Sequence, residues 1–121
     1  MFDLTLTTEF AAAHAIMLRG EREPVHGHNW RVTLVISGAD LDQDGLLCDF
    51  HQVEQTLAEV VGRFHNANLN DTPPFDQLNP SAEHVARHIG ENVDATLPSG
   101  VQVSAVTVTE APNCAATWRP A

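Results

Sequence analysis

Pro24-Val25-His26-Gly27-His28-Asn29-Trp30 opens an alternating apolar run, and we expect the rest of the chain to be arranged around it. Successive side chains on a β-strand point to opposite faces. His26 and His28 therefore share a face with the apolar residues that follow. These are Trp30, Val32, Leu34 and Ile36. The pattern predicts a strand over residues 30–37, with the two histidines at its entrance.

An earlier run has the matching parity and ends at His14. Its apolar members are Phe2, Leu4, Leu6, Phe10 and Ala12. Residues 2–10 alternate cleanly with polar residues, which predicts a half-buried strand. If the two runs pair as an antiparallel hairpin, the end of the first lies beside the start of the second. His14 then meets His26 and His28 on one face.

Three imidazoles with a fourth coordination position free are typical of a catalytic zinc site. We therefore predict that His14, His26 and His28 bind a metal ion. The competing interpretation is three solvated or packed histidines, because the H-x-H spacing also recurs by chance. Between the runs, residues 16–24 are charged and contain glycine and proline, which predicts a loop over the histidines.

Two helices are predicted in the middle of the chain. Asp49 has the properties of an N-cap, and one apolar stripe follows it at helical spacing. Its members are Phe50, Val53, Leu57, Val60, Val61 and Phe64. A second helix is predicted from Asn79-Pro80, since proline is tolerated at the first helical position. Its buried face comprises Ala82, Val85, Ala86, Ile89 and Val93. His84 and His88 are interpreted as part of a solvated face.

Val101–Glu110 and Cys114–Arg119 are predicted as two further strands. The order is ββααββ, which indicates an α+β fold with a four-stranded antiparallel sheet and two helices on one face. Residues 46–48 are a candidate extension of this sheet. A chain of 121 residues is predicted to form one domain over 1–121. Free sheet edges favour oligomerisation.

The formal net charge is −10, with six basic residues, all of them arginine. This balance argues against nucleic acid and anionic membranes as partners. The sequence has no apolar run long enough to span a bilayer and no leader pattern, so we expect a cytoplasmic location. Cys48 and Cys114 lie far apart and are expected to be reduced thiols.

Six short motifs, in register over nearly the whole chain, resemble the 6-pyruvoyl-tetrahydropterin synthase and 6-carboxy-tetrahydropterin synthase family. They are Phe10-Ala11-Ala12-Ala13-His14, His26-Gly27-His28-Asn29-Trp30, Asp49-Phe50, Leu69-Asn70-Asp71, Asn79-Pro80-Ser81-Ala82-Glu83 and Thr109-Glu110. The resemblance implies the T-fold, assembled as a trimeric barrel and usually a hexamer. It also implies zinc on the three histidines and a pterin pocket between subunits. Glu110 matches the glutamate that anchors the pterin ring, and Ser81 matches a hydroxyl residue of that pocket.

The chain departs from the family at the residues for proton transfer. Members that act on dihydroneopterin triphosphate usually carry a cysteine as C-x-x-x-H-G-H, and Arg22 stands there. The family's Asp-His pair aligns with His65-Asn66. Glu23, however, forms E-x-x-H-G-H. This resembles the branch in which glutamate replaces cysteine and the substrate side chain is cleaved to 6-hydroxymethyl-dihydropterin.

Two functions follow as hypotheses, and whether the chain is an enzyme stays open between them. The first is a pterin-type binding pocket at a subunit interface without ordinary synthase activity, with Glu23, His65 or Arg22 in new roles. The second is a zinc-dependent lyase on dihydroneopterin triphosphate with Glu23 as general base. The lost pair and the acidic charge favour the first. A positive charge on Arg22 near the histidines would weaken cation binding, so the zinc site could also be empty.

Overall fold

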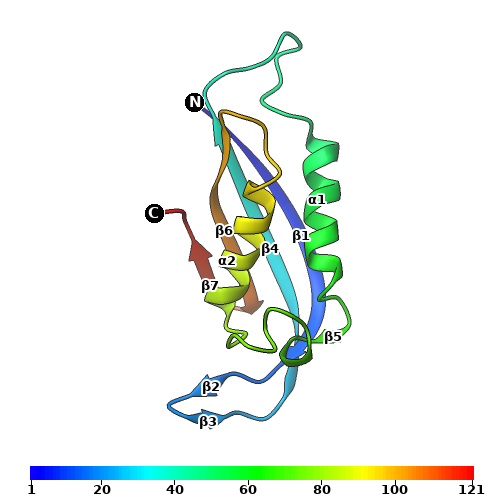
Figure 1. The fold of residues 1–121 in the computed structure, drawn as a ribbon, viewed down its shortest axis with the longest axis vertical. Coiled ribbons are helices and arrows are strands. Elements are labelled where there is room, and N and C mark those ends of the chain that lie inside the picture. The colour runs from blue at the N-terminus through cyan, green and yellow to red at the C-terminus, as the bar shows by residue number, and fades with distance from the viewer.

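A five-stranded sheet carries two helices on one face in the computed structural model, which describes residues 1–121 (Figure 1). In order across the sheet, the strands are β5 (Ala67–Asn68), β1 (Phe2–His14), β4 (His26–Gly38), β6 (Val101–Ala111) and β7 (Cys114–Trp118). The helices are α1 (Phe50–Gly62) and α2 (Ala82–Asp94). The remaining elements are a small hairpin of β2 (Met17–Leu18) and β3 (Glu21–Arg22), and a 3-10 turn, η1 (Leu69–Asp71).

The β1–β4 hairpin is the centre of the fold, and it has the predicted register. Phe2 lies opposite Gly38, and His14 lies opposite His26. The first strand is longer than the predicted 2–10, because the three alanines before His14 stay fully paired with β4. Strands β6 and β7 then add antiparallel to β4, so the predicted α+β order is confirmed.

The sheet has one strand more than predicted. Ala67–Asn68 pairs in parallel with Ala12 and Ala13 at the outer edge of β1. Two residues are too short for any periodic signal, so the sequence could not reveal this strand. The predicted sheet extension at 46–48 is wrong, since these residues form no strand. Leu47 instead packs against Gly38, where a side chain on the glycine would collide with it.

The core lies between the sheet and the two helices. Its largest fully buried side chains include Trp30, Phe10 and Phe64, and the rings of Phe10 and Trp30 stack with centroids 5.7 Å apart. Asp49 caps α1 as predicted, accepting a hydrogen bond from His51 N. Phe50 is 43% exposed, so the buried stripe of α1 starts one turn later than predicted.

Helix α2 begins at Ala82, later than the predicted start at Asn79-Pro80. Ser81 is its N-cap, and its hydroxyl accepts a hydrogen bond from His84 N. The prediction of a solvated histidine face is wrong for His88, which packs against the rings of Phe64 and Phe75. The i, i+4 spacing did not show that α1 and the following loop cover this side of α2.

The predicted loop over 16–24 contains the β2–β3 hairpin, which projects from one end of the molecule (Figure 1). Arg19 and Gly20 form its turn with positive φ angles of 52° and 83°. The histidines lie where this hairpin joins β1 and β4. Neither helix of the fold is long and apolar enough to cross a membrane.

Candidate metal and substrate site

Three histidine side chains converge where β1 ends and β4 begins. One ligand atom from each of His14, His26 and His28 lies within 4.8 Å of the other two. Ring centroids are 4.7 Å apart for His14 and His26, and 4.6 Å apart for His26 and His28. The antiparallel register produces this convergence, because His14 and His26 are direct cross-strand partners.

Backbone carbonyls fix the orientation of two of these rings. The Nδ1 of His14 pairs with Pro80 O at 2.8 Å, and the Nδ1 of His26 pairs with Pro24 O at 2.9 Å. A carbonyl only accepts, so each Nδ1 carries a proton, and in the neutral ring the Nε2 is then the atom with the free lone pair. An outer hydrogen bond of this kind is what orients a metal-ligating histidine.

Two of the Nε2 atoms lack a hydrogen-bond partner within the protein. Those of His14 and His28 are buried and make no hydrogen bond, although buried polar atoms nearly always have one. A cation shared by the Nε2 atoms would satisfy both, and three imidazoles are a donor set suited to zinc. The histidine cluster therefore fits a zinc ion.

Burial lowers the pKa of His28 below its ordinary value of 6.5, and His14 and His26 add to the effect. The carboxylates of Glu110 and Glu23 oppose it. The environment thus favours the neutral imidazole of His28, which is the form that binds metal.

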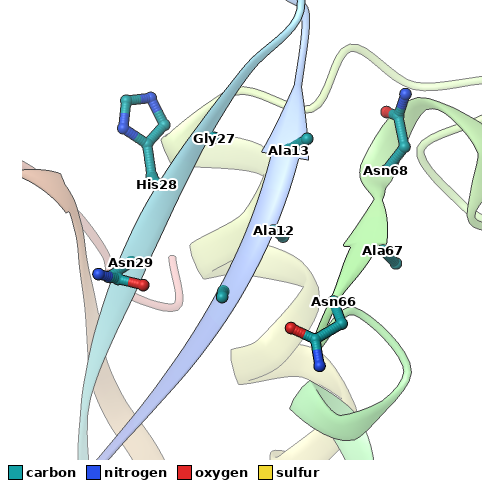
Figure 2. Close-up of a pocket in the computed structure, with 9 residues that line it drawn as sticks. Ala12, Ala13, Gly27, His28, Asn29, Asn66, Ala67 and Asn68 are labelled. Carbon is teal, nitrogen blue, oxygen red and sulfur yellow. The ribbon is translucent and has the colours of Figure 1, made fainter.

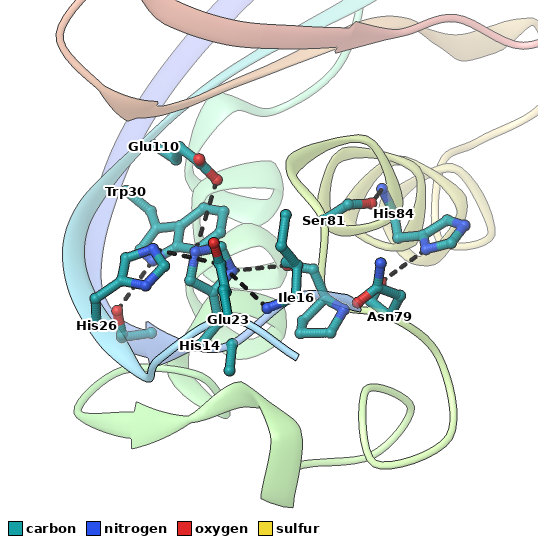
Figure 3. Close-up of polar contacts among 12 residues, drawn as sticks. His14, Ile16, Glu23, His26, Trp30, Asn79, Ser81, His84 and Glu110 are labelled. Atoms are coloured by element: carbon teal, nitrogen blue, oxygen red, sulfur yellow. Dashed lines mark hydrogen bonds and ion pairs between the residues drawn. The ribbon is translucent and has the colours of Figure 1, made fainter. Parts of the chain in front are cut away.

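Two half-buried carboxylates lie next to the histidines, one from β6 and one from the segment after β3 (Figure 3). Glu110, near the end of β6, places Oε2 3.8 Å from His14 Nε2. Glu23, just after β3, places Oε1 3.7 Å from His26 Nε2. The same Oε1 accepts a hydrogen bond from Ile16 N at 3.1 Å. The structure therefore brings the predicted pterin anchor and the predicted base to one site.

Two open hollows flank His28. One, of about 550 Å³, lies at the sheet edge between β4, β1 and β5 (Figure 2). Its lining is mostly small or amide side chains: Ala11, Ala12, Ala13, Gly27, His28, Asn29, Asn66, Ala67 and Asn68. The other, of about 650 Å³, lies toward β6 and includes His28, Thr109 and Glu110. Each has room for a fused bicyclic ligand.

The other candidate residues lie outside the histidine cluster. His65 is exposed, and its Nδ1 accepts a hydrogen bond from Ala11 N at 3.1 Å. Arg22 is exposed on β3 and makes none of the ion pairs in the structure. Ser81 is half-buried, and its hydroxyl caps α2.

Sequence reasoning missed the backbone groups that orient the site. The carbonyl of Pro80 holds His14, and the amide of Ile16 holds Glu23. The side chains of Asn70 and Asn79 also bind the segment that follows His14. Their motifs, L-N-D and N-P, were visible in the sequence. Periodicity gives no sign that a motif 50 residues or more away packs beside the histidines.

The chain is similar to proteins of known family. The model of the family described as 6-pyruvoyl tetrahydropterin synthase matches residues 3–121. The 6-carboxy-5,6,7,8-tetrahydropterin synthase of Bacillus subtilis is 33% identical, over 98% of this chain and 86% of that protein.

Solved structures share the fold at lower identity. The 6-pyruvoyl tetrahydropterin synthase of Caenorhabditis elegans superposes with a TM-score of 0.85 at 20% identity, covering 99% of this chain and 96% of that one. A 6-pyruvoyltetrahydropterin synthase of Plasmodium vivax, with a catalytic glutamate replaced by alanine, superposes with a TM-score of 0.71 at 22% identity, covering 99% of both chains.

Proposed function

Because the chain belongs to the 6-pyruvoyl tetrahydropterin synthase family, we propose that it is a zinc-dependent lyase acting on a pterin-type substrate. The proposed reaction cleaves the side chain of dihydroneopterin triphosphate, with Glu23 as the base. The observation that carries this proposal is the place of the Glu23 carboxylate, half-buried and 3.7 Å from His26 Nε2. In the P. vivax protein a glutamate is catalytic, so the same residue type serves catalysis on this fold.

The residues present divide the work between them. His14, His26 and His28 would hold zinc, which when bound polarises an oxygen of the substrate as a Lewis acid. Glu110 would accept paired N–H donors of the pterin ring, because an ionised carboxylate has two acceptor oxygens. The hollow beside Glu110 and His28 gives the ring room to reach both.

Glu23 would then remove the proton of a side-chain hydroxyl. The neighbouring carbon–carbon bond breaks, and the hydroxyl carbon leaves as an aldehyde that keeps the triphosphate. The electron pair stays on the carbon attached to the pterin, where the ring imine delocalises it. Reprotonation of that carbon gives 6-hydroxymethyl-dihydropterin and returns the site to its starting state.

Replacing the base tests this role. Glu23→Gln keeps the size of the side chain and removes its basicity, so turnover should fall by about 10²–10⁴-fold. Glu21→Gln is the matched control, since Glu21 is an exposed carboxylate of the same hairpin. Formation of 6-hydroxymethyl-dihydropterin at equal rates by the two variants would exclude Glu23 as the base.

A second candidate function is pterin binding without ordinary synthase activity. The observation that favours it is the state of His65, which stands in place of the family's acidic partner. His65 is exposed and its Nδ1 is occupied by Ala11 N, so this chain has no activating pair for a second proton transfer. Tight binding of a pterin with no product formed would select this function.

We further propose that the pocket lies between subunits of a homo-oligomer, a hexamer built as a dimer of trimers. Strand β5 covers only two residues of β1. The rest of that edge, and the outer edge of β7, have no neighbouring strand. The hollow at β1, β4 and β5 lies beside this edge and shares His28 with the hollow at Glu110. A neighbouring subunit that covers the edge would therefore close the side of the pocket next to His28.

A further inference from the structure

Two asparagine side chains hold the segment that links the metal ligand His14 to the β2–β3 hairpin. The carboxamide of Asn70 accepts from Ala15 N at 2.8 Å and donates to Ala15 O at 2.9 Å. The carboxamide of Asn79 accepts from Met17 N at 2.8 Å and donates to Met17 O at 3.2 Å. Each amide thus satisfies both backbone groups of one residue, as a neighbouring strand would.

The residue between them faces the other way. In an extended chain, the backbone groups of successive residues point to opposite sides, so holding Ala15 and Met17 directs Ile16 away from the asparagines. Ile16 O accepts from Glu23 N at 3.1 Å, and Ile16 N donates to Glu23 Oε1 at 3.1 Å. The backbone N–H and C=O of Ile16 are therefore the groups of this segment that bind Glu23.

We propose that Asn70 and Asn79 are positioning residues for Glu23. They fix the backbone of residues 15–17, and the amide of Ile16 then holds the Glu23 carboxylate beside His26 Nε2. Neither asparagine takes part in any of the ion pairs at the histidines. The inference rests on the proposed function, because Glu23 acts as a base only in the lyase reaction.

Asn79 has a second connection to the site through the chain itself. Its carbonyl pairs with His84 Nδ1 at 2.7 Å and accepts from Ser81 N at 2.8 Å. The next carbonyl, that of Pro80, orients His14. Figure 3 shows Asn79 and His84 on the side of His14 and Ile16 that is away from His26. The Asn79 variants therefore need a check of metal affinity, whereas Asn70 makes no such link and gives the cleaner variant.

The first arm of the test does not depend on activity. Amide hydrogen exchange of Ile16, followed by NMR on the full zinc-loaded protein, should accelerate by about tenfold in Asn70→Ala and in Asn79→Ala. Asn92→Ala is the matched control, since Asn92 bonds only within α2. Unchanged exchange of Ile16 in both asparagine variants would overturn the inference. If an alanine variant does not fold, the Asn→Asp variant replaces it, because it keeps the acceptor oxygen but replaces the donor by a charged oxygen that the facing carbonyl repels.

The second arm is turnover of dihydroneopterin triphosphate. Asn70→Ala should lower kcat by about 10–100-fold with KM unchanged, because a base displaced by about 1 Å loses rate and leaves pterin binding intact. In the Glu23→Gln background the same substitution should have no further effect. An equal loss in both backgrounds would overturn the inference. If the wild-type protein gives no product, the proposed function fails, and the exchange of Ile16 alone decides whether the asparagines hold Glu23.

Discussion

At the scale of single residues, the site depends on which atoms lack partners. The Nε2 atoms of His14 and His28 are buried and make no hydrogen bond, and the carboxylates of Glu23 and Glu110 lie 3.7–3.8 Å from the nearest histidine nitrogens. Such an arrangement costs stability in the absence of a cation or a ligand. A bound cation or ligand that satisfies these atoms would recover this stability.

Glu110 should carry most of the pterin affinity. Glu110→Gln keeps the shape and replaces one acceptor oxygen by a donor, so a pair of charge-assisted hydrogen bonds becomes a mismatch. We expect the affinity for a dihydropterin to fall by about 100-fold, measured by calorimetry. Glu54→Gln, an exposed position on α1, is the control. Equal affinities of the two variants would remove Glu110 from the pocket.

His88 should make stability depend on pH. Burial lowers its pKa below the ordinary 6.5, and Arg63 adds to this while Glu91 opposes it. Below about pH 6.5 the unfolded chain then binds more protons than the folded one, so the free energy of unfolding decreases as the pH falls. This part of the loss is complete below the folded-state pKa.

Urea denaturation between about pH 7 and pH 5 measures this dependence. The decrease in the free energy of unfolding from about pH 7 to about pH 5 should be smaller in His88→Gln than in the wild type. His51→Gln, at a side chain that is 92% exposed, should leave it unchanged. A His88→Gln curve parallel to that of the wild type would contradict the account.

At the scale of elements, the sequence predicted the long strands and both helices, because each carries a full periodic stripe. The parity of His14, His26 and His28 was also sufficient to predict that they meet. The short elements were missed, since β5, β2 and β3 have two residues each. The contacts of Asn70 and Asn79 were missed because they join distant segments through side-chain amides.

Gly90 shows where helix propensity gives the wrong expectation. Alanine in a helix is favoured over glycine by about 1 kcal/mol. At Gly90, however, a Cβ would overlap the ring of Trp118 on β7 and lie 3.1 Å from Val106 Cγ2. We expect Gly90→Ala to lower the free energy of unfolding by about 1–2 kcal/mol, because the ring of Trp118 must move away from α2 to make room for the added methyl group.

Gly62→Ala is the matched control for this substitution. Gly62 is the last residue of α1, and nothing lies within 4 Å of its added Cβ. We expect its free energy of unfolding to be unchanged or slightly increased. Urea denaturation compares the two variants, and a stabilised Gly90→Ala protein would show that Trp118 does not constrain α2.

At the scale of the whole molecule, the sheet has open edges next to the site. The exposed backbone groups of β1 and β7 favour pairing with another copy of the chain. Sedimentation velocity should show a homo-oligomer of hexamer size, and dilution that dissociates it should also weaken pterin binding. A monomer that binds a pterin with undiminished affinity would place the whole pocket within one subunit.

The family, the α+β fold and the histidine cluster all follow from motifs in the sequence, and the reaction is the claim that needs the most direct test. That test is incubation of the zinc-loaded wild-type protein with dihydroneopterin triphosphate, with the products separated by chromatography. The lyase account predicts 6-hydroxymethyl-dihydropterin and an aldehyde that keeps the triphosphate, in equal amounts. A substrate that binds but is recovered intact would contradict the lyase account and leave a pterin-binding protein.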